Sequence, residues 1–411
     1  MAIPGSPRVV ITGLGQVSAA GCTLDAFARA IFDGRSGIRR LGDLHAPGLP
    51  DPIGAALSDF DPDRWPLAPT VPASRATRYA YAAASEAFAH AGLDRTDRRR
   101  GGVFVGTGFG GQAESEDTYR TCFEHPGTRP RPSVIPAAMA NGTAGVLATE
   151  LRLLGENVTL SIACASGSHA IGHAYRALQR RALDLAVAVG TDAPLTPIVM
   201  SAWNAMRVLA PSGADPATAC RPFSADRGGL VLGEGAGALV LETLDHAHAR
   251  GARVLAEIIG YGSNADGGHI TNPSVDGVAA CLVLALEDAG VLPADVGYVN
   301  THGTATLAND RTEAEALARV FGSTARTLPI SSTKPVHGHA MGASGALEAI
   351  ASILALDRQL LPPTATVRTP DPALPVLDYI GDTARAAAIN VALSNSFAFG
   401  GNNAVLIFRR T

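Results

Sequence analysis

The sequence predicts an α/β protein made of two similar halves, and three observations support this fold class. Short apolar runs bounded by glycine recur along the 411 residues, as buried strands do, and alanine-rich amphipathic stretches lie between them, as helices do. Hydrophobic residues make up 46% of the chain and charged residues 17%, and there are 45 glycines. This composition favours an interior of buried strands and closely packed glycines over an array of solvent-exposed helices.

The first half of the chain alternates predicted strands and helices. We expect buried strands at 9–12, 102–105, 158–162, 183–189 and 238–241, and helices at 79–91 and 170–183. The segments 47–72 and 124–136 have no clean periodicity, so we expect them to form surface excursions that are candidate binding loops.

The second half repeats this order. A strand is expected at 297–300, a helix at 345–356 and a strand at 404–408, and a glycine cluster precedes the last strand of each half. Because the chain exceeds the usual size of one domain, we predict an internal duplication. Its period is far too long for a solenoid. We expect residues 1–246 and 247–411 to form the two halves, with the active-site loops gathered where they meet.

Charge and cysteine content exclude several classes of protein. The net charge is -4, from 33 basic and 37 acidic residues, so no bulk field points to nucleic acid or to an anionic membrane. The five cysteines are scattered and form no CxxC pair, which argues against a disulfide framework and a zinc knuckle. No run reaches the roughly 18 apolar residues of a membrane span. The N-terminus leads straight into a strand without a signal peptide's apolar core. We therefore expect a soluble cytoplasmic protein.

Cys164 is a candidate nucleophile. It follows a predicted strand and precedes a predicted helix, so its thiol is expected to face the positive end of the helix, which lowers the pKa of a cysteine and favours the thiolate. The alternative is a small buried hydrophobic residue, and this segment alone favours neither. Gly167 and the small residues around it favour the nucleophile, because they let a substrate approach the sulfur.

His302 is a candidate catalytic partner. It lies at the end of a predicted strand, where an imidazole is placed to donate to a developing oxyanion. The alternative is a core histidine that is bound to backbone. We expect Asp310, Arg311 and Glu313 just beyond it to cap and solubilise the next helix.

His339 is the second candidate histidine. It forms a His-x-His pair with His337, but no cysteine or acidic cluster nearby completes a coordination set, so we expect no metal. Lys334, five residues earlier, is expected either to tune the electrostatics of His339 or to be a solvated surface lysine.

Glycine-rich turns offer one further candidate. The turn at 400–403 follows two aromatic residues, and it either presents a backbone N–H to an oxyanion or simply reverses the chain. The runs 106–111 and 233–237 have neither the spacing of a dinucleotide fingerprint nor the Gly-Lys-Ser/Thr of a P-loop. We therefore expect no nucleotide at either run.

Taken together, these segments resemble the β-ketoacyl-ACP synthases, in particular the Cys-His-His group that elongates acyl chains and includes type II polyketide ketosynthases. The resemblance runs nearly end to end. It is carried by five ordered motifs, which are Ala163-Cys164-Ala165-Ser166-Gly167, Arg221-Pro222-Phe223 through 233–237, Asn300-Thr301-His302-Gly303-Thr304, Ser332-Thr333-Lys334 with Gly338-His339, and Asn395-Ser396-Phe397 through Gly401-Asn402.

The resemblance implies the thiolase fold, in which two similar halves build five αβαβα layers, and it implies a dimer. It also implies that Cys164 takes an acyl group from an acyl carrier protein, with an oxyanion hole made of the backbone N–H groups of Cys164 and Phe399. His302 and His339 would hold the thioester carbonyl of malonyl-ACP while carbon dioxide leaves, and the enolate would attack the acyl-cysteine. No cofactor is implied, because the substrates arrive on the phosphopantetheine arm of the carrier protein.

Further residues are assigned by the same resemblance. Thr271, Thr304 and Thr306 would hydrogen-bond the arm, Lys334 would lie behind the second histidine with Glu348 as its acidic companion, and Phe399 would be a gating aromatic. An acidic carrier protein needs a complementary basic dock. The candidates for that dock, each of which as a lone arginine is more often solvated surface, are Arg75, Arg78, Arg129, Arg131 and Arg207.

Two departures from the family pattern bear on the substrate. Phe109 and Trp203 fall where the family lines its acyl pocket, and both are bulky. We therefore expect a narrowed or flat pocket for short, unsaturated or aryl-bearing chains, as in polyene or polyketide pathways, rather than for long saturated ones. The segment Pro335-Val336-His337 stands where relatives carry less rigid, neutral residues, and we expect it to crowd or re-tune the site around His339.

Competing members of the fold are less well matched. A thiolase would carry a second cysteine in the turn at 400–403, and an initiating synthase would use a Cys-His-Asn set. A cysteine hydrolase needs neither two histidines nor a threonine-lined arm site. A non-catalytic subunit like a chain-length factor usually lacks the nucleophile, which this chain has. The dimer partner is therefore expected to be either an identical chain or a ketosynthase-like chain-length factor.

Overall fold

The computed structural model describes residues 5–93 and 98–411. Its main feature is an 11-stranded sheet in the order β12-β10-β9-β14-β15-β8-β1-β7-β6-β4-β5. The strands of this sheet are β1 (Val9–Ser18), β4 (Gly101–Gly106), β5 (Asn157–Leu160), β6 (Leu185–Asp192), β7 (Gly235–Thr243), β8 (Ala256–Ala265), β9 (Tyr298–Asn300), β10 (Pro329–Ser331), β12 (Asp378–Tyr379), β14 (Val391–Ala398) and β15 (Asn402–Arg409). Two small sheets pair β2 (Arg39–Arg40) with β3 (Ile53–Gly54) and β11 (Leu360–Leu361) with β13 (Arg385–Ala386).

The sheet consists of two halves with the same strand order. In the first half β4 is parallel to β5 and β6, β6 is antiparallel to β7, and β7 is antiparallel to β1. In the second half β9 is parallel to β10 and β14, β14 is antiparallel to β15, and β15 is antiparallel to β8. A short antiparallel pairing of β1 with β8 joins them. The predicted α/β class and the duplication are confirmed, while the boundary at 246/247, which falls inside a helix, stays a prediction.

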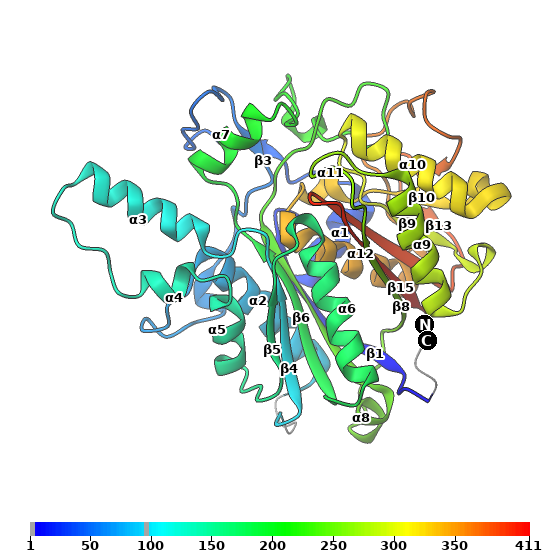
Figure 1. Cartoon of the computed structure of the whole chain (residues 1–411), viewed down its shortest axis with the longest axis horizontal. Helices are drawn as coiled ribbons and strands as arrows, with labels where there is room; N and C mark the ends of the chain where they lie inside the picture. Colours follow the sequence, from blue (N-terminus) through cyan, green and yellow to red (C-terminus); the bar gives the residue numbers. More distant parts are fainter. Residues whose placement is uncertain (1–4, 94–97) are drawn as a thin grey trace.

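Helices form three further layers around and between the halves (Figure 1). The helices α2 (Arg75–Ala91) and α5 (Gly142–Glu150) cover the outer face of the first half, and α9 (Val275–Ala289) and α10 (Leu307–Phe321) cover that of the second. Between the halves lie α6 (Ser166–Gln179) and α12 (Ser344–Arg358). Separate apolar clusters fill the spaces between these layers. The layers therefore follow the predicted αβαβα order.

The two central helices approach each other closely where they begin. A Cβ on Gly167 of α6 would lie 2.6 Å from the carbonyl oxygen of Gly342, and a Cβ on Gly190 of β6 would lie equally close to the same oxygen. Gly167 therefore allows the packing of α6 against the turn before α12, which is a role that the sequence did not reveal. The same packing brings the N-termini of α6 and α12 to one place in the molecule.

The remaining helices lie mostly on the periphery. They are α1 (Leu24–Asp33), α3 (Gln112–Glu124), α4 (Val134–Ala138), α7 (Pro197–Ala205), α8 (Leu244–Ala249) and α11 (Lys334–His337). Together α3 and α4 form a flap that projects from the body (Figure 1), and the exposed 124–133 segment joins them, as the predicted excursion requires. None of the helices in the described part of the chain is long and apolar enough to cross a membrane.

Candidate active site

Cys164 lies in a single 3-10 turn, Ala163–Ala165, that joins β5 to α6. Ala163 takes a φ of 44°, which is uncommon for a residue with a side chain and marks a sharp turn. The thiol is 4% exposed and packs in an apolar cluster. The predicted strand-to-helix position is therefore correct.

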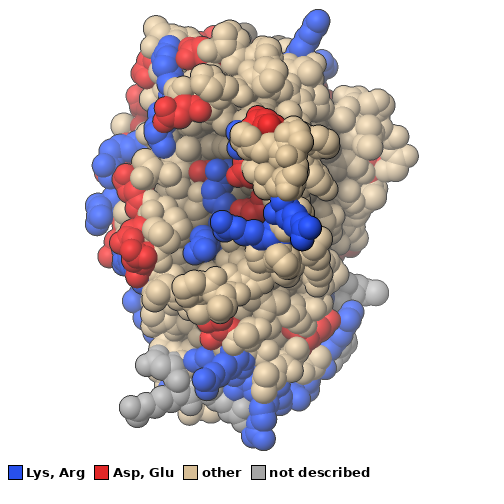
Figure 2. Space-filling model, turned by 90° about the vertical axis from the view of Figure 1, so that its left-hand side faces the viewer, with Lys and Arg blue, Asp and Glu red and all other residues tan. Residues whose placement is uncertain are grey.

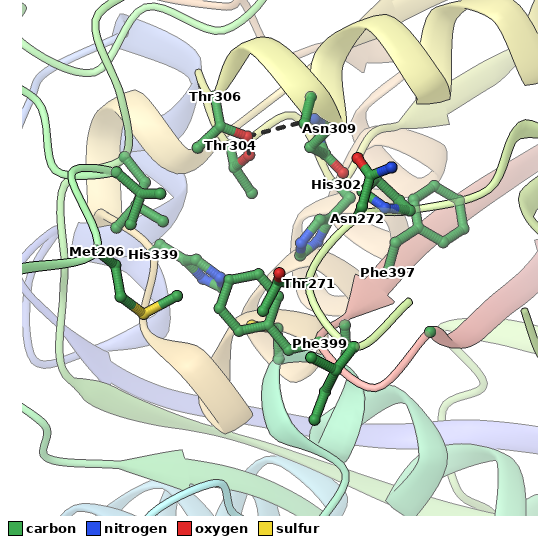
Figure 3. Close-up of a pocket in the computed structure, with 18 of the residues that line it drawn as sticks. Met206, Thr271, Asn272, His302, Thr304, Thr306, Asn309, His339, Phe397 and Phe399 are labelled. Carbon is green, nitrogen blue, oxygen red and sulfur yellow. Dashed lines mark hydrogen bonds between the residues drawn. The ribbon is translucent and has the colours of Figure 1, made fainter. Parts of the chain in front are cut away.

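Three reactive side chains meet at this turn. The sulfur of Cys164 and one ring nitrogen from each of His302 and His339 all lie within 4.8 Å of one another. The two imidazole rings are 5.4 Å apart between centroids, with their planes at 86°. They face a cavity of about 220 Å³ that Cys164 also lines, and Figure 3 shows both rings turned into it. The three residues predicted from separate motifs thus form one site.

Lys334 fixes the orientation of His302. Its ammonium nitrogen donates to the backbone carbonyl of His302 and lies 3.4 Å from Nδ1 of the same ring. Because an ammonium group only donates, Nδ1 must accept, and the ring proton is left on Nε2. Burial lowers the pKa of His302 well below 6.5, and the Lys334 charge lowers it further. The ring is therefore a neutral hydrogen-bond donor.

The position of Lys334 differs from the prediction in one respect. The resemblance placed it behind the second histidine, yet its direct contact is with the first, His302. It is no surface lysine either, because it is fully buried and forms an ion pair with Glu348. Neither Lys334 nor Glu348 belongs to the described residues that line the cavity, and Glu348 is the acidic companion of Lys334 that the resemblance implies. Burial raises the pKa of Glu348 to about 7, against the opposing effect of Lys334.

His339 is held by backbone and by one hydroxyl. Its N–H donates to the carbonyl of Val231 at 2.7 Å, and its carbonyl accepts from Gly233 at 2.9 Å. Its Nδ1 lies 3.0 Å from the Ser344 hydroxyl, so Nε2 is the nitrogen left to face the cavity. Burial lowers the pKa of His339 well below 6.5, and the charge of Lys334 adds to that effect.

His337 forms no metal pair with His339. Its Nε2 lies 3.0 Å from the Thr333 hydroxyl and its Nδ1 lies 2.8 Å from the Gly338 carbonyl, so both ring nitrogens are occupied. The effect expected of the segment Pro335-Val336-His337 on the site around His339 stays a prediction; His337 acts with burial and Lys334 to lower the pKa of His339.

Burial of Cys164 opposes the expected stabilisation of its thiolate. Burial raises the pKa of the thiol to about 12, because an apolar surrounding disfavours the charged sulfur. The charge of Lys334 and the backbone N–H groups of Cys164 and Phe399 act in the opposite direction but do not outweigh burial. The resting group is a thiol, so a base must take its proton.

Phe399 brings a backbone donor and an aromatic ring to the sulfur. Its backbone N–H and that of Cys164 both hydrogen-bond the Cys164 sulfur. These are the two donors that were predicted to form the oxyanion hole. Its ring stacks on Trp203 at 5.5 Å between centroids. The following glycine, Gly400, has a φ of 88° and donates to the carbonyl of Ile270 at 2.6 Å.

The mouth of the cavity is polar. Thr304, Thr306 and Thr271 line it as predicted, and the two hydroxyls of Thr304 and Thr306 lie 2.9 Å apart. Figure 3 shows the first two threonines on one side of the cavity and Asn272 on the other. The sequence analysis did not single out three polar lining residues that lie close in sequence to predicted ones, namely His269, Asn272 and Asn309.

Two carboxylates beneath the His302 loop were also misjudged. Asp310 and Glu313 are fully buried, although they were expected to cap and solubilise α10. Glu313 accepts the backbone N–H groups of His302 at 2.9 Å and Gly303 at 2.8 Å, and Asp310 accepts that of Thr304 at 3.1 Å. The signal that identifies them is their i, i+3 spacing, which places both on one helix face.

The two bulky residues expected in the acyl pocket are placed differently. Trp203 lines the cavity. Phe109 packs against the apolar cluster that contains Cys164, Trp203 and Met341, but the described lining of the cavity does not include it. Phe109 therefore packs beside the site without lining the cavity.

The five docking arginines have unequal surroundings. Arg75 donates to the carbonyls of Ala193 and Leu195 and lies 3.4 Å from Glu234, so it is tied to the interior. Arg207 is exposed and directly follows Met206, which lines the catalytic cavity.

The other three, Arg78, Arg129 and Arg131, line one surface groove together with Glu114 and Asp117. Figure 2 shows the flap side of the molecule, where basic and acidic side chains gather around a hollow. Four of the five arginines are therefore available at the surface.

Comparison with known families shows a match along most of the chain. A family model described as "Beta-ketoacyl synthase, N-terminal domain" matches residues 6–247, and one described as "Beta-ketoacyl synthase, C-terminal domain" matches residues 255–368. Nodulation protein E of Rhizobium sp. (strain N33) is 43% identical, over 98% of this chain and 99% of its own. The 3-oxoacyl-(acyl-carrier-protein) synthase 2 of Coxiella burnetii is 38% identical, over 98% of both chains.

Solved structures agree with the sequence comparison. The ishigamide ketosynthase/chain length factor has a TM-score of 0.92 and 34% identity, covering 99% of this chain and 100% of its own. A β-ketoacyl synthase from Burkholderia phymatum has a TM-score of 0.91 and 39% identity, with coverages of 98% and 100%. A type II polyketide synthase acyl carrier protein in complex with its ketosynthase, bound to the hexaketide, has a TM-score of 0.89 and 29% identity, with coverages of 99% and 100%.

Proposed function

This chain belongs to the β-ketoacyl synthase family and condenses an acyl group with malonyl-ACP, and we propose that Cys164, His302 and His339 share the chemistry of that reaction. The observation that carries the proposal is the meeting of the Cys164 sulfur with one nitrogen from each histidine within 4.8 Å. A thiol supplies the nucleophile, and two neutral imidazoles supply hydrogen-bond donors and a base.

The first proposed step is acyl transfer to Cys164. The sulfur attacks the thioester carbonyl of acyl-ACP, a histidine takes the thiol proton, and the tetrahedral oxyanion accepts from the N–H groups of Cys164 and Phe399. The carbon–sulfur bond to the phosphopantetheine arm then breaks, and the proton passes to the departing thiolate. Each oxyanion donor is typically worth about 3 kcal/mol. Because the thiol has a pKa of about 12, this step needs the neutral histidine beside it.

The second proposed step is decarboxylative condensation. The thioester oxygen of malonyl-ACP accepts from Nε2–H of His302 and His339, the bond from the α-carbon to the carboxylate breaks, and carbon dioxide leaves. The α-carbon of the enolate then attacks the acyl-cysteine carbonyl. Expulsion of the Cys164 thiolate, which takes up one proton, gives the β-ketoacyl-ACP. Two neutral donors suit this step, because each hydrogen bond strengthens as charge develops on the oxygen.

A metal ion is the competing use of the same three atoms, since a cysteine and two histidines are common zinc ligands. One observation favours condensation without a metal. The Lys334 ammonium lies against His302, where it would repel a divalent cation.

We propose short, unsaturated or aryl-bearing acyl groups as substrates. The cavity of about 220 Å³ must hold the end of the arm as well as the acyl group, and Trp203 stacked on Phe399 gives it a flat wall. A flat aromatic wall suits planar chains, because stacking of planar groups adds to their burial.

The similar solved structures include ketosynthases in complex with an acyl carrier protein or with a chain length factor. We propose that the carrier docks near Arg78, Arg129, Arg131 and Arg207, with Arg75 as a structural residue. We further propose a dimer, homodimeric or with a chain-length factor. It is supported by the position of β5 at the sheet edge and by the exposed Phe123 on the flap, since proteins rarely leave such features uncovered. The cytoplasm is the proposed setting, because Cys164 must remain reduced.

Intact-mass measurement with acyl-ACPs of varied length and unsaturation tests this function. We expect one acyl adduct on the wild type and none on Cys164→Ala, and we expect the adducts to persist after dialysis against a chelator. His339→Ala should lose malonyl-ACP decarboxylation by about 100-fold or more, as expected for a general acid or base. An adduct that persists in Cys164→Ala, or normal decarboxylation by His339→Ala, would remove the assigned roles.

A further inference from the structure

A buried carboxylate at the end of β6 has no place in the mechanism above. Asp192 is fully buried, and its two oxygens accept four hydrogen bonds. Oδ1 accepts from the Thr107 hydroxyl at 2.7 Å and from the Phe109 N–H at 2.9 Å. Oδ2 accepts from the N–H groups of Gly108 at 2.8 Å and Gly342 at 2.6 Å. Both carboxylate oxygens are thus fully hydrogen-bonded, so Asp192 connects the segments that supply these donors and is not an unpaired buried charge.

The four donors come from both halves of the duplicated fold. Thr107, Gly108 and Phe109 follow β4 of the first half, whereas Gly342 lies in the turn before α12 of the second. The contact itself requires the glycine at 342 and leaves little room for a side chain at 108. A Cβ on Gly108 would lie 3.1 Å from Oδ2 of Asp192, and a Cβ on Gly342 would lie 2.7 Å from it. The carboxylate therefore holds two backbone segments together at a distance that side chains would prevent.

These two segments carry the walls beside the nucleophile. Phe109 is itself one of the residues bound by Asp192, and Met341 precedes Gly342 with a φ of 51°. Met341 belongs to the apolar cluster that contains Cys164, and Phe109 packs against that cluster. Asp192 binds the backbone N–H of Phe109 itself and that of Gly342, the residue after Met341. The position of Asp192 therefore determines how closely the Phe109 and Met341 side chains approach the sulfur.

We propose that Asp192 is a positioning residue that sets the acyl-chain preference of Cys164 by holding Phe109 and Met341 against it. The inference rests on the proposed function, since it requires that Cys164 carries the acyl group. The decarboxylation site has further anchors of its own, because the His339 backbone is also held by Val231 and Gly233. Loss of Asp192 should therefore disturb acyl transfer more than decarboxylation.

The experiment measures acyl transfer and decarboxylation side by side in the full chain. Rates of adduct formation on Cys164 are recorded by intact mass for a ladder of acyl-ACPs from short to long and from saturated to unsaturated, and carbon dioxide release is recorded with malonyl-ACP. For Asp192→Asn we expect acylation by the preferred chain to fall by about tenfold or more, since small misplacements of positioning groups have effects of this size. The acylation rates of the different acyl-ACPs should become more similar, because Phe109 and Met341 are held less firmly. Decarboxylation should stay within about threefold of the wild type.

Two further variants keep the test decisive. Asp288→Asn removes another buried carboxylate, one that accepts from the Tyr261 N–H at 2.9 Å, and it should leave the chain preference unchanged. Thr107→Val removes one of the four donors, together with the acceptor of the Gly110 N–H, and keeps the carboxylate, so it should shift the preference in the same direction by a smaller factor. If Asp192→Asn does not fold, Thr107→Val decides the question.

The possible results separate the inference from the proposed function. A uniform fall for every acyl chain and for decarboxylation in Asp192→Asn means a purely structural residue and overturns the inference. An unchanged preference in Thr107→Val does the same. Absence of any adduct on the wild type refutes the acyl-carrying role of Cys164 itself, which is a different failure.

Discussion

Lys334 is the only lysine in the sequence, and the fold buries it completely beside the reacting atoms. Its ammonium contacts His302 and Glu348. A lysine in such a place is costly, because a buried charge needs both a partner and hydrogen bonds. The 32 other basic side chains are arginines, which suit exposed docking sites equally well. The presence of a lysine at position 334 is therefore explained by its buried contacts with His302 and Glu348 rather than by its positive charge alone.

Replacement of Lys334 separates its structural role from its effect on catalysis. Lys334→Met should destabilise the protein by about 3–5 kcal/mol, because Glu348 is left as an unpaired buried charge. The double variant Lys334→Met/Glu348→Gln should recover most of that stability, since no charge remains unpaired. Both variants should decarboxylate malonyl-ACP about 10- to 100-fold more slowly, because the tautomer of His302 is no longer fixed.

Thermal unfolding and carbon dioxide release measure the two effects of this change. A stable double variant that decarboxylates as fast as the wild type would show that Lys334 does not position His302. Acylation of Cys164 is recorded in the same variants as a second readout, and it should slow as well, because the Lys334 charge lowers the pKa of the Cys164 thiol.

At the scale of elements, α10 supports the loop that carries His302. Its first two turns direct Asp310 and Glu313 at the backbone N–H groups of 302–305. The exposed face of the same helix pairs Arg311 with Glu315 at 2.8 Å. One helix thus carries acidic residues with opposite surroundings, buried on the loop side and exposed to solvent on the other.

Glu313→Gln tests the support that α10 gives to the loop. The amide NH₂ would face one of the two N–H groups that the carboxylate now accepts, so we expect a loss of about 1–3 kcal/mol in the free energy of unfolding. Decarboxylation should fall, because His302 is displaced, whereas acylation of Cys164 should change little. Glu315→Gln on the exposed face is the matched control, and it should stay within about 0.5 kcal/mol of the wild type.

Equal effects of Glu313→Gln and Glu315→Gln in denaturant unfolding would contradict this account. An equal loss of acylation and decarboxylation in Glu313→Gln would show general damage to the fold instead of a displaced loop.

The sequence predicted those parts of the fold and site that have a local signature. Glycine-bounded apolar runs located β1, β4, β6, β7 and β15, and motif position located Cys164, His302 and His339. The strand β8 was missed because its last residues are polar and glycine-rich, which breaks the apolar run. Burial of Asp310 and Glu313, and the contact of Lys334 with His302, depend on elements distant in sequence. A charge pattern on one helix does not show which face is covered.

At the scale of the whole molecule, a buried ion-pair network joins the layers of the first half. Glu242 of β7 is fully buried and accepts from Arg250 and His246 of the α8 region and from Thr12 of β1. Arg250 also donates to the carbonyl of Ala91 at the end of α2. The carboxylate of Glu242 therefore connects two strands with two helical segments far from the active site.

This network predicts how stability depends on pH. Burial acts to raise the pKa of Glu242, but the hydrogen bonds from Arg250, His246 and Thr12 outweigh it and lower the pKa from 4.5 to about 2. A carboxyl group whose pKa is lower in the folded state stabilises the fold above its unfolded pKa, and this contribution is lost as the pH falls through the folded value. The stabilisation by Glu242 should therefore be complete at neutral pH and should fade between about pH 4.5 and pH 2.

Glu242→Gln measures this contribution against the wild type. Other buried carboxylates, such as Asp192 and Glu348, have raised pKa values and respond to acid in the opposite sense, but they are present in both proteins and cancel in the difference. Denaturant unfolding should show a loss of about 3 kcal/mol for Glu242→Gln at pH 7, and this difference should shrink steadily below pH 4.5. Glu257→Gln, whose partner Arg8 is largely exposed, is the control and should cost under about 1 kcal/mol. A difference between the wild type and Glu242→Gln that stays constant from pH 7 to pH 3 would show that the network stabilises the fold by packing rather than by charge.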